Sequence, residues 1–187
     1  MKLYEISDNY INYLKRDPKL LHVYVNKDEQ HKKRKYIGLV VSNIANNKNK
    51  FFIPFCSPKN KDFIVINGEK VIRNDSPIVV RIKVFSKKTH KYILKGSLQL
   101  GTMIPCPDSE LKEYRIKNEQ DIKYRNLVSL QMKFIKKNIK TILKKASLVY
   151  NQKINERNFK TMPKYLPYII DFAYAIERCN EYISKKD

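Results

Sequence analysis

The sequence predicts an α+β fold in which a run of strands precedes a run of helices. Up to about residue 105, short apolar segments rich in β-branched and aromatic residues alternate with polar turns, as in antiparallel sheets. After Pro107 the apolar residues recur every three or four positions, the period of an amphipathic helix. Such segregation is typical of α+β domains. The chain of 187 residues has no internal repeat and no long linker, so we expect one domain over 1–187. Its strand-rich core is expected at about 1–105 and its helical part at about 108–187.

The N-terminal segment predicts a strand followed by a helix. Leu3–Ile6 is a short apolar run, and Ser7 is a suitable N-cap for a helix that ends before Pro18. Tyr10 lies on the apolar face of that helix. We expect it to be half-buried with its hydroxyl free to reach a site, although an ordinary core tyrosine fits the same pattern.

Two continuous apolar runs predict a buried antiparallel hairpin. Tyr36–Val41 and Phe51–Phe55 are rich in β-formers and are joined by a polar turn at residues 43–50. Pro54 interrupts the second run, and proline within a strand favours an edge or a bulge.

The next segments predict further strands. Phe63–Ile72 contains Asn67-Gly68 between apolar runs, a strong hairpin signal. Ile78–Phe85 alternates apolar and basic residues, which predicts a half-exposed strand with a basic outer face. Tyr92–Leu94 and Ser97–Met103 are expected to complete the sheet.

The C-terminal part predicts two helices. From Val128 to Val149 one continuous apolar stripe runs along a single predicted helix. Its opposite face carries the clearest basic stripe of the chain, formed by Lys133, Lys136, Lys137, Lys140 and Lys144. A merely solvated face is an equally good interpretation of that stripe alone. Pro167–Ser184 predicts the last helix.

Charge is the strongest signal in the composition. The chain carries 39 Lys and Arg against 18 Asp and Glu, a net charge of +21, yet it is 42% hydrophobic and can form a core. This excess requires a polyanionic partner. Because the basic residues are spread along the whole chain, and not gathered on one amphipathic helix, nucleic acid is favoured over a membrane surface.

The cysteines and histidines predict neither disulfides nor a metal site. Cys56, Cys106 and Cys179 are widely spaced and odd in number, as free thiols in a reducing cytoplasm are. The three histidines have no ligand spacing, so we expect no metal and no cofactor. Neither a signal peptide nor a membrane span is apparent, and a cytoplasmic location is expected.

The segment FFIPFCSPKNK, Phe51–Lys61, carries the most distinctive chemistry. A buried strand delivers the hydroxyl of Ser57 and the ammonium groups of Lys59 and Lys61 to a turn. A strand end is a rigid support for a site. The plainer interpretation is a Ser-Pro turn with solvated lysines.

Several segments, in their order and spacing, resemble the ToxN/AbiQ family of endoribonuclease toxins from type III toxin–antitoxin systems. They are LYEISDNYINYLK, KYIGLVV, FFIPFCSPK, LGTMIPC and the helix YRNLVSLQMKFIKKNIKTILKKASLVY. The resemblance spans about residues 1–150. It implies a compact, twisted antiparallel sheet or partly open barrel similar to the MazF/Kid toxins, with added helices that are mainly C-terminal.

The resemblance also implies a function. Family members are metal-independent ribonucleases that are inhibited by a cognate antitoxin RNA, a pseudoknot made from a tandem repeat. Toxin and RNA form a closed ring, and release of the toxin on phage infection leads to abortive infection. The substrate would be mRNA, cut at selected sequences, and no DNA partner is expected. Attack by the 2′-OH would leave a 2′,3′-cyclic phosphate and a 5′-OH.

The resemblance assigns site residues position by position. The catalytic candidates are Tyr10, Ser57, Lys59, Arg34 and Cys56. Arg34 stands in place of a family lysine, and Cys56 stands in place of a threonine. A family tyrosine in the basic loop, Lys27–Lys35, aligns with Gln30, and Tyr24 is the alternative if the loop folds differently. The cations expected to bind RNA are Lys32, Lys33, Lys35, Lys61, Lys133, Lys136, Lys137, Lys140 and Lys144.

Two other function classes compete with this one. A non-catalytic RNA-binding module, such as a ribosome-associated protein, explains the charge equally well. The enzyme is favoured because Ser57 and Lys59 follow a strand and combine with Tyr10 and Arg34. A DNA-binding regulator is less favoured, because the sequence has no recognisable helix-turn-helix.

Overall fold

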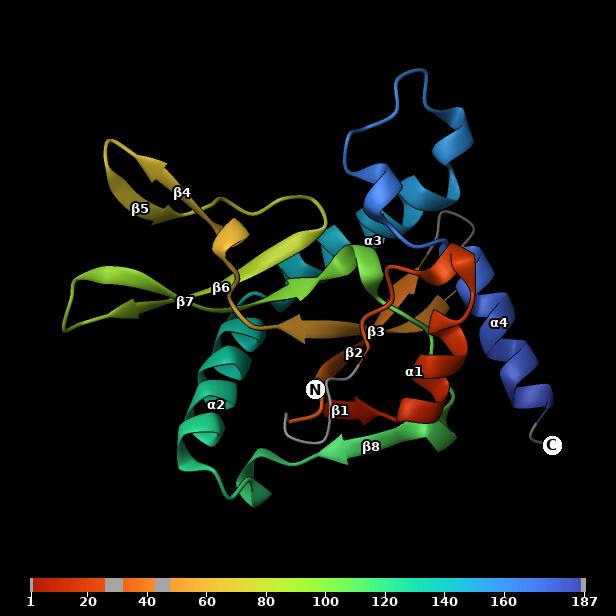
Figure 1. The fold of residues 1–187 in the computed structure, drawn as a ribbon, viewed down its shortest axis with the longest axis horizontal. Coiled ribbons are helices and arrows are strands. Elements are labelled where there is room, and N and C mark those ends of the chain that lie inside the picture. Colours follow the sequence, from red (N-terminus) through yellow and green to blue (C-terminus); the bar gives the residue numbers. More distant parts are fainter. Residues whose placement is uncertain (1, 26–31, 43–47, 186–187) are drawn as a thin grey trace.

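The computed structural model describes residues 2–25, 32–42 and 48–185, and it confirms the α+β fold class (Figure 1). The strands of the main sheet are β1 (Leu3–Ile6), β2 (Tyr36–Ser42), β3 (Lys48–Cys56), β6 (Val79–Ser86), β7 (Lys91–Gln99) and β8 (Leu111–Tyr114). They are antiparallel and ordered β6-β7-β3-β2-β1-β8. The helices are α1 (Asp8–Lys15), α2 (Ile122–Lys137), α3 (Ile139–Ile154) and α4 (Phe172–Ser184). Among the described residues β6 and β8 do not pair, so the sheet is open and not a closed barrel.

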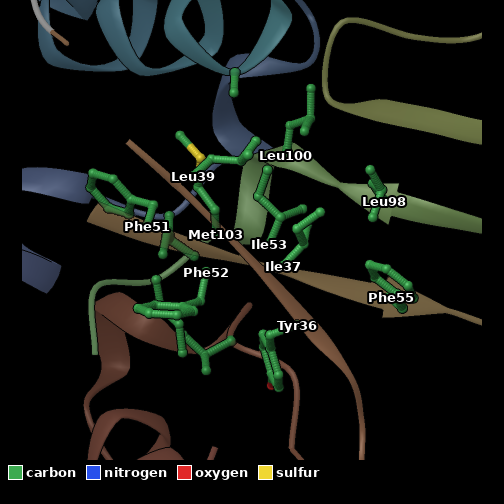
Figure 2. Close-up of a cluster of buried hydrophobic side chains, with 14 of the residues drawn as sticks. Tyr36, Ile37, Leu39, Phe51, Phe52, Ile53, Phe55, Leu98, Leu100 and Met103 are labelled. Carbon is green, nitrogen blue, oxygen red and sulfur yellow. The ribbon is translucent and has the colours of Figure 1, made fainter. Parts of the chain in front are cut away.

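The β2–β3 hairpin lies at the centre of the sheet, as its apolar runs predict. Side chains alternate between the two faces, and both faces are covered, which explains why the runs Tyr36–Leu39 and Phe51–Phe55 are apolar without interruption. Phe51 and Phe52 point to opposite sides (Figure 2). Phe51 packs 5.3 Å from Tyr150 of α3 and 5.5 Å from Phe172 of α4, measured between ring centroids. On the other face Phe52 lies 5.4 Å from Tyr4 of β1.

Pro54 lies in a central strand and not at an edge of the sheet. It is opposite Tyr36 of β2, and its missing N–H falls on the side that faces β7. There the pairing of β3 is interrupted, between the Phe52–Ile104 bridge and the Phe55–Leu98 pair. The sheet therefore tolerates the proline at a gap in hydrogen bonding between two central strands.

Two hairpins project from the same side of the molecule (Figure 1). The first is a separate two-stranded sheet of β4 (Phe63–Ile66) and β5 (Glu69–Ile72). Asn67 and Gly68 form its turn with φ values of 50° and 78°, as predicted. The second is β6–β7, in which the two short strands predicted after residue 91 are one strand. The predicted basic outer face of β6 is only partly present, since Arg81 is buried.

Two predictions about the helical part are wrong. Residues 111–114 form β8, which pairs with β1 and lengthens the sheet. The single long helix is two helices, because the chain breaks at Asn138, whose φ is −109° and whose side-chain amide donates to the Phe134 carbonyl at 2.8 Å. The apolar stripe nevertheless remains buried, from Val128 in α2 to Val149 in α3.

The last helix begins at Phe172, later than predicted, because Pro167 belongs to a short 3-10 turn. Asp171 caps the helix by accepting from the Tyr174 N–H at 3.0 Å. None of the helices in the described part of the chain has the length and apolar content to cross a bilayer.

A basic cavity at the end of strand β3

The C-terminal end of β3 opens into a cavity of about 440 Å³. The cations that line it are Lys32, Lys33, Arg34, Lys35, Lys59 and Lys95. Ser57 lines it beside Lys59, so the two strand-end residues face one space. Tyr24 and, from α2, Tyr124 and Gln131 complete the walls. Among its described lining residues there is no Asp, Glu or His, and we call this space the basic cavity.

Arg34 joins the basic loop to the strand end. Its Nη1 donates to the Phe55 carbonyl at 2.6 Å and to the Cys56 Sγ at 3.1 Å. Its guanidinium carbon lies 4.6 Å from the centroid of the Tyr24 ring. The thiol at the position of the family threonine is therefore a hydrogen-bond acceptor for Arg34, and Cys56 is buried behind it.

Hydrogen bonds fix the backbone of Lys59, whereas its side chain is exposed. The Lys59 N–H donates to Asp62 Oδ2 at 2.9 Å, and the Asp62 N–H donates back to the Lys59 carbonyl at 2.9 Å. Asp62 is buried and pairs with buried Arg81 at 3.1 Å. The Lys59 Nζ lies 5.7 Å from the centroid of the Tyr24 ring. A buried ion pair thus anchors the turn that carries the lysine.

Tyr24, the alternative to Gln30 as the counterpart of the family tyrosine, lines the basic cavity. Its ring contacts Arg34 and Lys59 inside the basic cavity. Burial raises the pKa of the Tyr24 hydroxyl to about 12; the neighbouring Cys56 thiol adds to the rise, and Arg34 opposes it. The hydroxyl is therefore protonated at neutral pH and can donate a hydrogen bond. Gln30, which aligns with the family tyrosine, lies outside the described residues, as do residues 43–47 of the predicted polar turn.

Tyr10 is not brought to this cavity. The apolar face of α1 packs inward, so Tyr10 is fully buried and its hydroxyl donates to the Pro105 carbonyl at 2.9 Å. Its ring packs against Tyr13 and Tyr182. Burial raises the pKa of its hydroxyl well above the usual range, with the neighbouring Cys179 adding to the rise. The geometry is that of a core tyrosine, and we leave Tyr10 out of the proposed site.

The three lysines in the described part of the basic loop are paired with carboxylates. Lys32 pairs with Glu119 and Asp121. Lys33 pairs with Asp8 at 2.7 Å. Lys35 is buried, pairs with Glu5 and lies 4.4 Å from the centroid of the Tyr114 ring. Lys35 is therefore placed as a structural cation, whereas the side chains of Lys32 and Lys33 are partly exposed at the edge of the cavity.

The remaining predicted RNA-binding lysines lie elsewhere. Lys61 lines a neighbouring cavity of about 550 Å³ that shares Tyr24 and Arg34 with the basic cavity. The exposed lysines of the predicted stripe divide between two helices, with Lys133, Lys136 and Lys137 on α2 and Lys140 and Lys144 on α3. They do not form one face of one helix.

Sequence patterns did not predict the contribution of β7 and α2 to the cavity. Gln131 is buried and its Nε2 donates to the Lys95 carbonyl at 2.6 Å. The next residue along β7, Gly96, has φ 137°, and a Cβ there would lie 2.8 Å from the Cys56 carbonyl oxygen. An isolated glycine within a strand pattern indicates such a close approach. In a chain with only 4 glycines, this signal was present in the sequence.

Two comparisons with known proteins, by family model and by sequence, point to the same family. Residues 2–179 match the family model described as Toxin ToxN, type III toxin-antitoxin system. The curated Endoribonuclease ToxN of Bacillus thuringiensis subsp. kurstaki is 33% identical over 185 residues, which are 97% of this chain and 84% of that protein.

Solved structures agree with this match. One, from work on selective toxin inhibition by a non-coding RNA pseudoknot in bacterial type III toxin–antitoxin systems, has a TM-score of 0.71 at 31% identity, covering 97% of this chain and 96% of that chain. AbiQ, a lactococcal anti-phage endoribonuclease of a type III system, has a TM-score of 0.71 at 23% identity and covers 98% of both chains. At that identity, AbiQ shows the shared fold.

Proposed function

Because the chain belongs to the ToxN family of type III toxin–antitoxin systems, we propose that it is an endoribonuclease toxin with an antiviral role. The observation that carries the proposal is the basic cavity, in which Ser57, Lys59, Arg34 and Tyr24 line one space. RNA cleavage requires positive charge around a phosphate and a fixed attacking hydroxyl. Cations at a rigid strand end supply the positive charge, and contacts from the Ser57 and Tyr24 side chains can hold the RNA so that its own 2′-hydroxyl stays in place to attack.

The reaction uses the nucleophile that RNA itself carries. The 2′-oxygen attacks the adjacent phosphorus, the bond from phosphorus to the 5′-oxygen breaks, and the products are a 2′,3′-cyclic phosphate and a 5′-hydroxyl. The proton of the 2′-OH leaves to a base, and the 5′-oxygen takes up a proton. Arg34 and Lys59 balance the charge that develops on the phosphorane oxygens. Ser57 orients the phosphate or relays a proton, and protonated Tyr24 can donate to an oxygen.

We propose that this cleavage needs no metal ion. The described lining of the basic cavity offers cations and no carboxylate, and magnesium sites in proteins are built from oxygen ligands, chiefly carboxylates. Lysine and arginine take over the charge stabilisation that a metal would provide. The check is cleavage in the presence of EDTA, which should proceed at the same rate as in its absence.

We also propose that a cognate repeat RNA, folded as a pseudoknot, inhibits the toxin in a closed toxin–RNA assembly. The net charge of +21 calls for such a polyanion, and a structural relative at 31% identity comes from work on toxin inhibition by an RNA pseudoknot. RNA that occupies the basic cavity would exclude substrate.

The test of the nuclease is toxicity in a bacterial host. Expression of the protein should arrest growth, and Ser57→Ala or Lys59→Ala should each relieve the arrest while binding of antitoxin RNA is largely kept. Purified protein should cut RNA to ends that carry a 2′,3′-cyclic phosphate. Lys112→Ala, at an exposed lysine on β8 that does not line the basic cavity, is the matched control and should stay toxic. If the wild-type protein neither arrests growth nor cuts RNA, it is a non-catalytic RNA-binding module.

A further inference from the structure

The β6–β7 hairpin ends in exposed aromatic side chains, away from the basic cavity. Phe85 and Tyr92 face each other across the two strands, with ring centroids 5.5 Å apart. They are 50% and 62% exposed. The ring of His90, in the turn, lies 6.4 Å from that of Phe85. We call Phe85, His90 and Tyr92 the aromatic tip; the hairpin that carries it projects from the body of the molecule (Figure 1).

Exposure of this kind needs a reason, because aromatic side chains stabilise proteins mainly by burying their large area. Half-exposed rings on a projecting hairpin contribute little to the core. The neighbouring hairpin is linked to this one by an exposed ion pair, Lys91 with Glu69 at 3.7 Å, and it does not cover the rings. Contiguous exposed apolar surface is typical of a binding site.

The charge of the residues around the aromatic tip indicates which kind of partner would bind there. Residues 81–95 contain many Lys and Arg and no Asp or Glu. Lys87 and Lys88, in the turn of the hairpin, are exposed. Protein–protein interfaces are depleted in lysine. Surfaces for single-stranded nucleic acid, in contrast, combine basic residues that follow the backbone with aromatic rings on which bases stack.

The aromatic tip is carried by a strand that also reaches the basic cavity. Lys95 of β7 lines the cavity, and Tyr92 lies three residues away on the same strand. At about 3.3 Å per residue, this separation is about 10 Å. An RNA strand that leaves the cavity along β7 therefore reaches the aromatic tip within a few nucleotides.

We propose that the aromatic tip stacks unpaired bases of RNA and holds the chain outside the cleavage cavity. The proposal rests on the proposed function for the identity of the ligand, RNA, but not on cleavage. The rings of Phe85 and Tyr92 would stack bases, while Lys87 and Lys88 contact phosphates. The tip then adds affinity for long RNA that a short oligonucleotide, bound in the cavity alone, does not experience.

The experiment measures RNA binding by Ser57→Ala protein, which does not cut its probe. The probes are fluorescent oligouridylates of about 20 and about 2 nucleotides, which lie above and below the site sizes of stacking grooves, and the short one cannot fill the cavity and reach the tip at once. Phe85→Leu with Tyr92→Leu removes the rings but keeps apolar side chains. We expect roughly tenfold weaker binding of the long probe, as loss of stacked bases predicts, and less than about twofold change for the short one.

The matched control is on the neighbouring hairpin. Val65 and Ile66 are 72% and 50% exposed, so Val65→Ser with Ile66→Ser changes apolar surface of similar exposure without removing a ring. It should leave the affinity for both probes unchanged. Circular dichroism and sedimentation velocity establish that each variant is folded and report its oligomeric state.

Three results would overturn the proposal. The leucine variant could keep full affinity for the long probe, or the two probes could lose affinity equally, or wild-type protein could self-associate through the tip while the leucine variant does not. The last result would assign the surface to a second copy of the chain. Failure of the nuclease proposal is separate: protein with Ser57 intact would then bind the long probe through the tip and leave RNA uncut.

Discussion

At the scale of single residues, Lys59 shows how a buried group can control an exposed one. Its ammonium group is at the surface, but its backbone is held in a reciprocal pair of hydrogen bonds with Asp62. Asp62 is held in turn by Arg81, whose Nη1 donates to the Asn74 carbonyl at 2.6 Å. We infer that the Asp62–Arg81 pair positions Lys59 and does not itself contact RNA.

Asp62→Asn tests this positioning role. The substitution leaves the buried Arg81 charge without its carboxylate, so the free energy of unfolding should fall by about 3–5 kcal/mol. Cleavage should fall as well, because the turn that carries Lys59 loosens. Urea unfolding and a cleavage assay at a temperature where the variant is folded measure the two effects.

The control for this variant is Asp108→Asn. Asp108 forms an exposed ion pair with Lys50, and such pairs contribute about 0–1 kcal/mol. Stability and cleavage should both stay close to the wild-type values. If Asp62→Asn lowers stability but folded protein cuts RNA at the wild-type rate, Asp62 is structural only.

At the scale of elements, the site depends on how closely β7 crosses the end of β3. Gly96 makes this approach possible, because a side chain at that position would collide with the Cys56 carbonyl. Gln131 of α2 fixes the same segment through its hydrogen bond to the Lys95 carbonyl. Three elements thus determine where the strand end, and with it Ser57, is located.

Gly96→Ala should therefore affect the site more than the fold. A positive φ costs an alanine about 1–2 kcal/mol, and the added Cβ must also displace the Cys56 carbonyl. Gly68→Ala is a matched control, since Gly68 also has a positive φ but has open space around it. Both variants should lose stability in thermal unfolding, Gly96→Ala the more because of the collision, but only Gly96→Ala should lose cleavage when both are assayed folded. Equal cleavage by both would show that the crossing of β7 is not needed for activity.

At the scale of the whole molecule, some of the positively charged side chains are paired with carboxylates and others are exposed to solvent. Lys32, Lys33 and Lys35, in the described part of the basic loop, are paired with Glu119, Asp8 and Glu5. The exposed lysines of α2 and α3, in contrast, point away from the core. The surface that attracts RNA over long distances is therefore expected to include these two helices, in addition to the basic cavity.

The RNA that copurifies with Ser57→Ala protein should prove, on sequencing, to be a discrete repeat-length species whose affinity falls steeply with salt. Glutamine at Lys133, Lys136 and Lys137, or at Lys140 and Lys144, should reduce the slope of log K against log salt by about 0.7 for each phosphate that is no longer neutralised. The two sets are replaced separately because they lie on different helices. A flat salt response, or a smear of unrelated RNA, would contradict this electrostatic picture.

The sequence by itself determined the features that depend on neighbouring residues. The turn at Asn67-Gly68, the buried β2–β3 hairpin and the delivery of Ser57 and Lys59 to a strand end all follow from local patterns. The family resemblance was also visible in short motifs, of which FFIPFCSPK is the clearest.

Only the tertiary structure decided which distant residues meet. Tyr10 and Tyr24 are both tyrosines near the N-terminus, but packing buries the first against Pro105 and places the second beside Arg34. Edge pairing of β8 with β1 and the break at Asn138 likewise have weak local signals. Contacts across the fold have free energies that exceed local preferences, and a sequence read segment by segment does not contain those contacts.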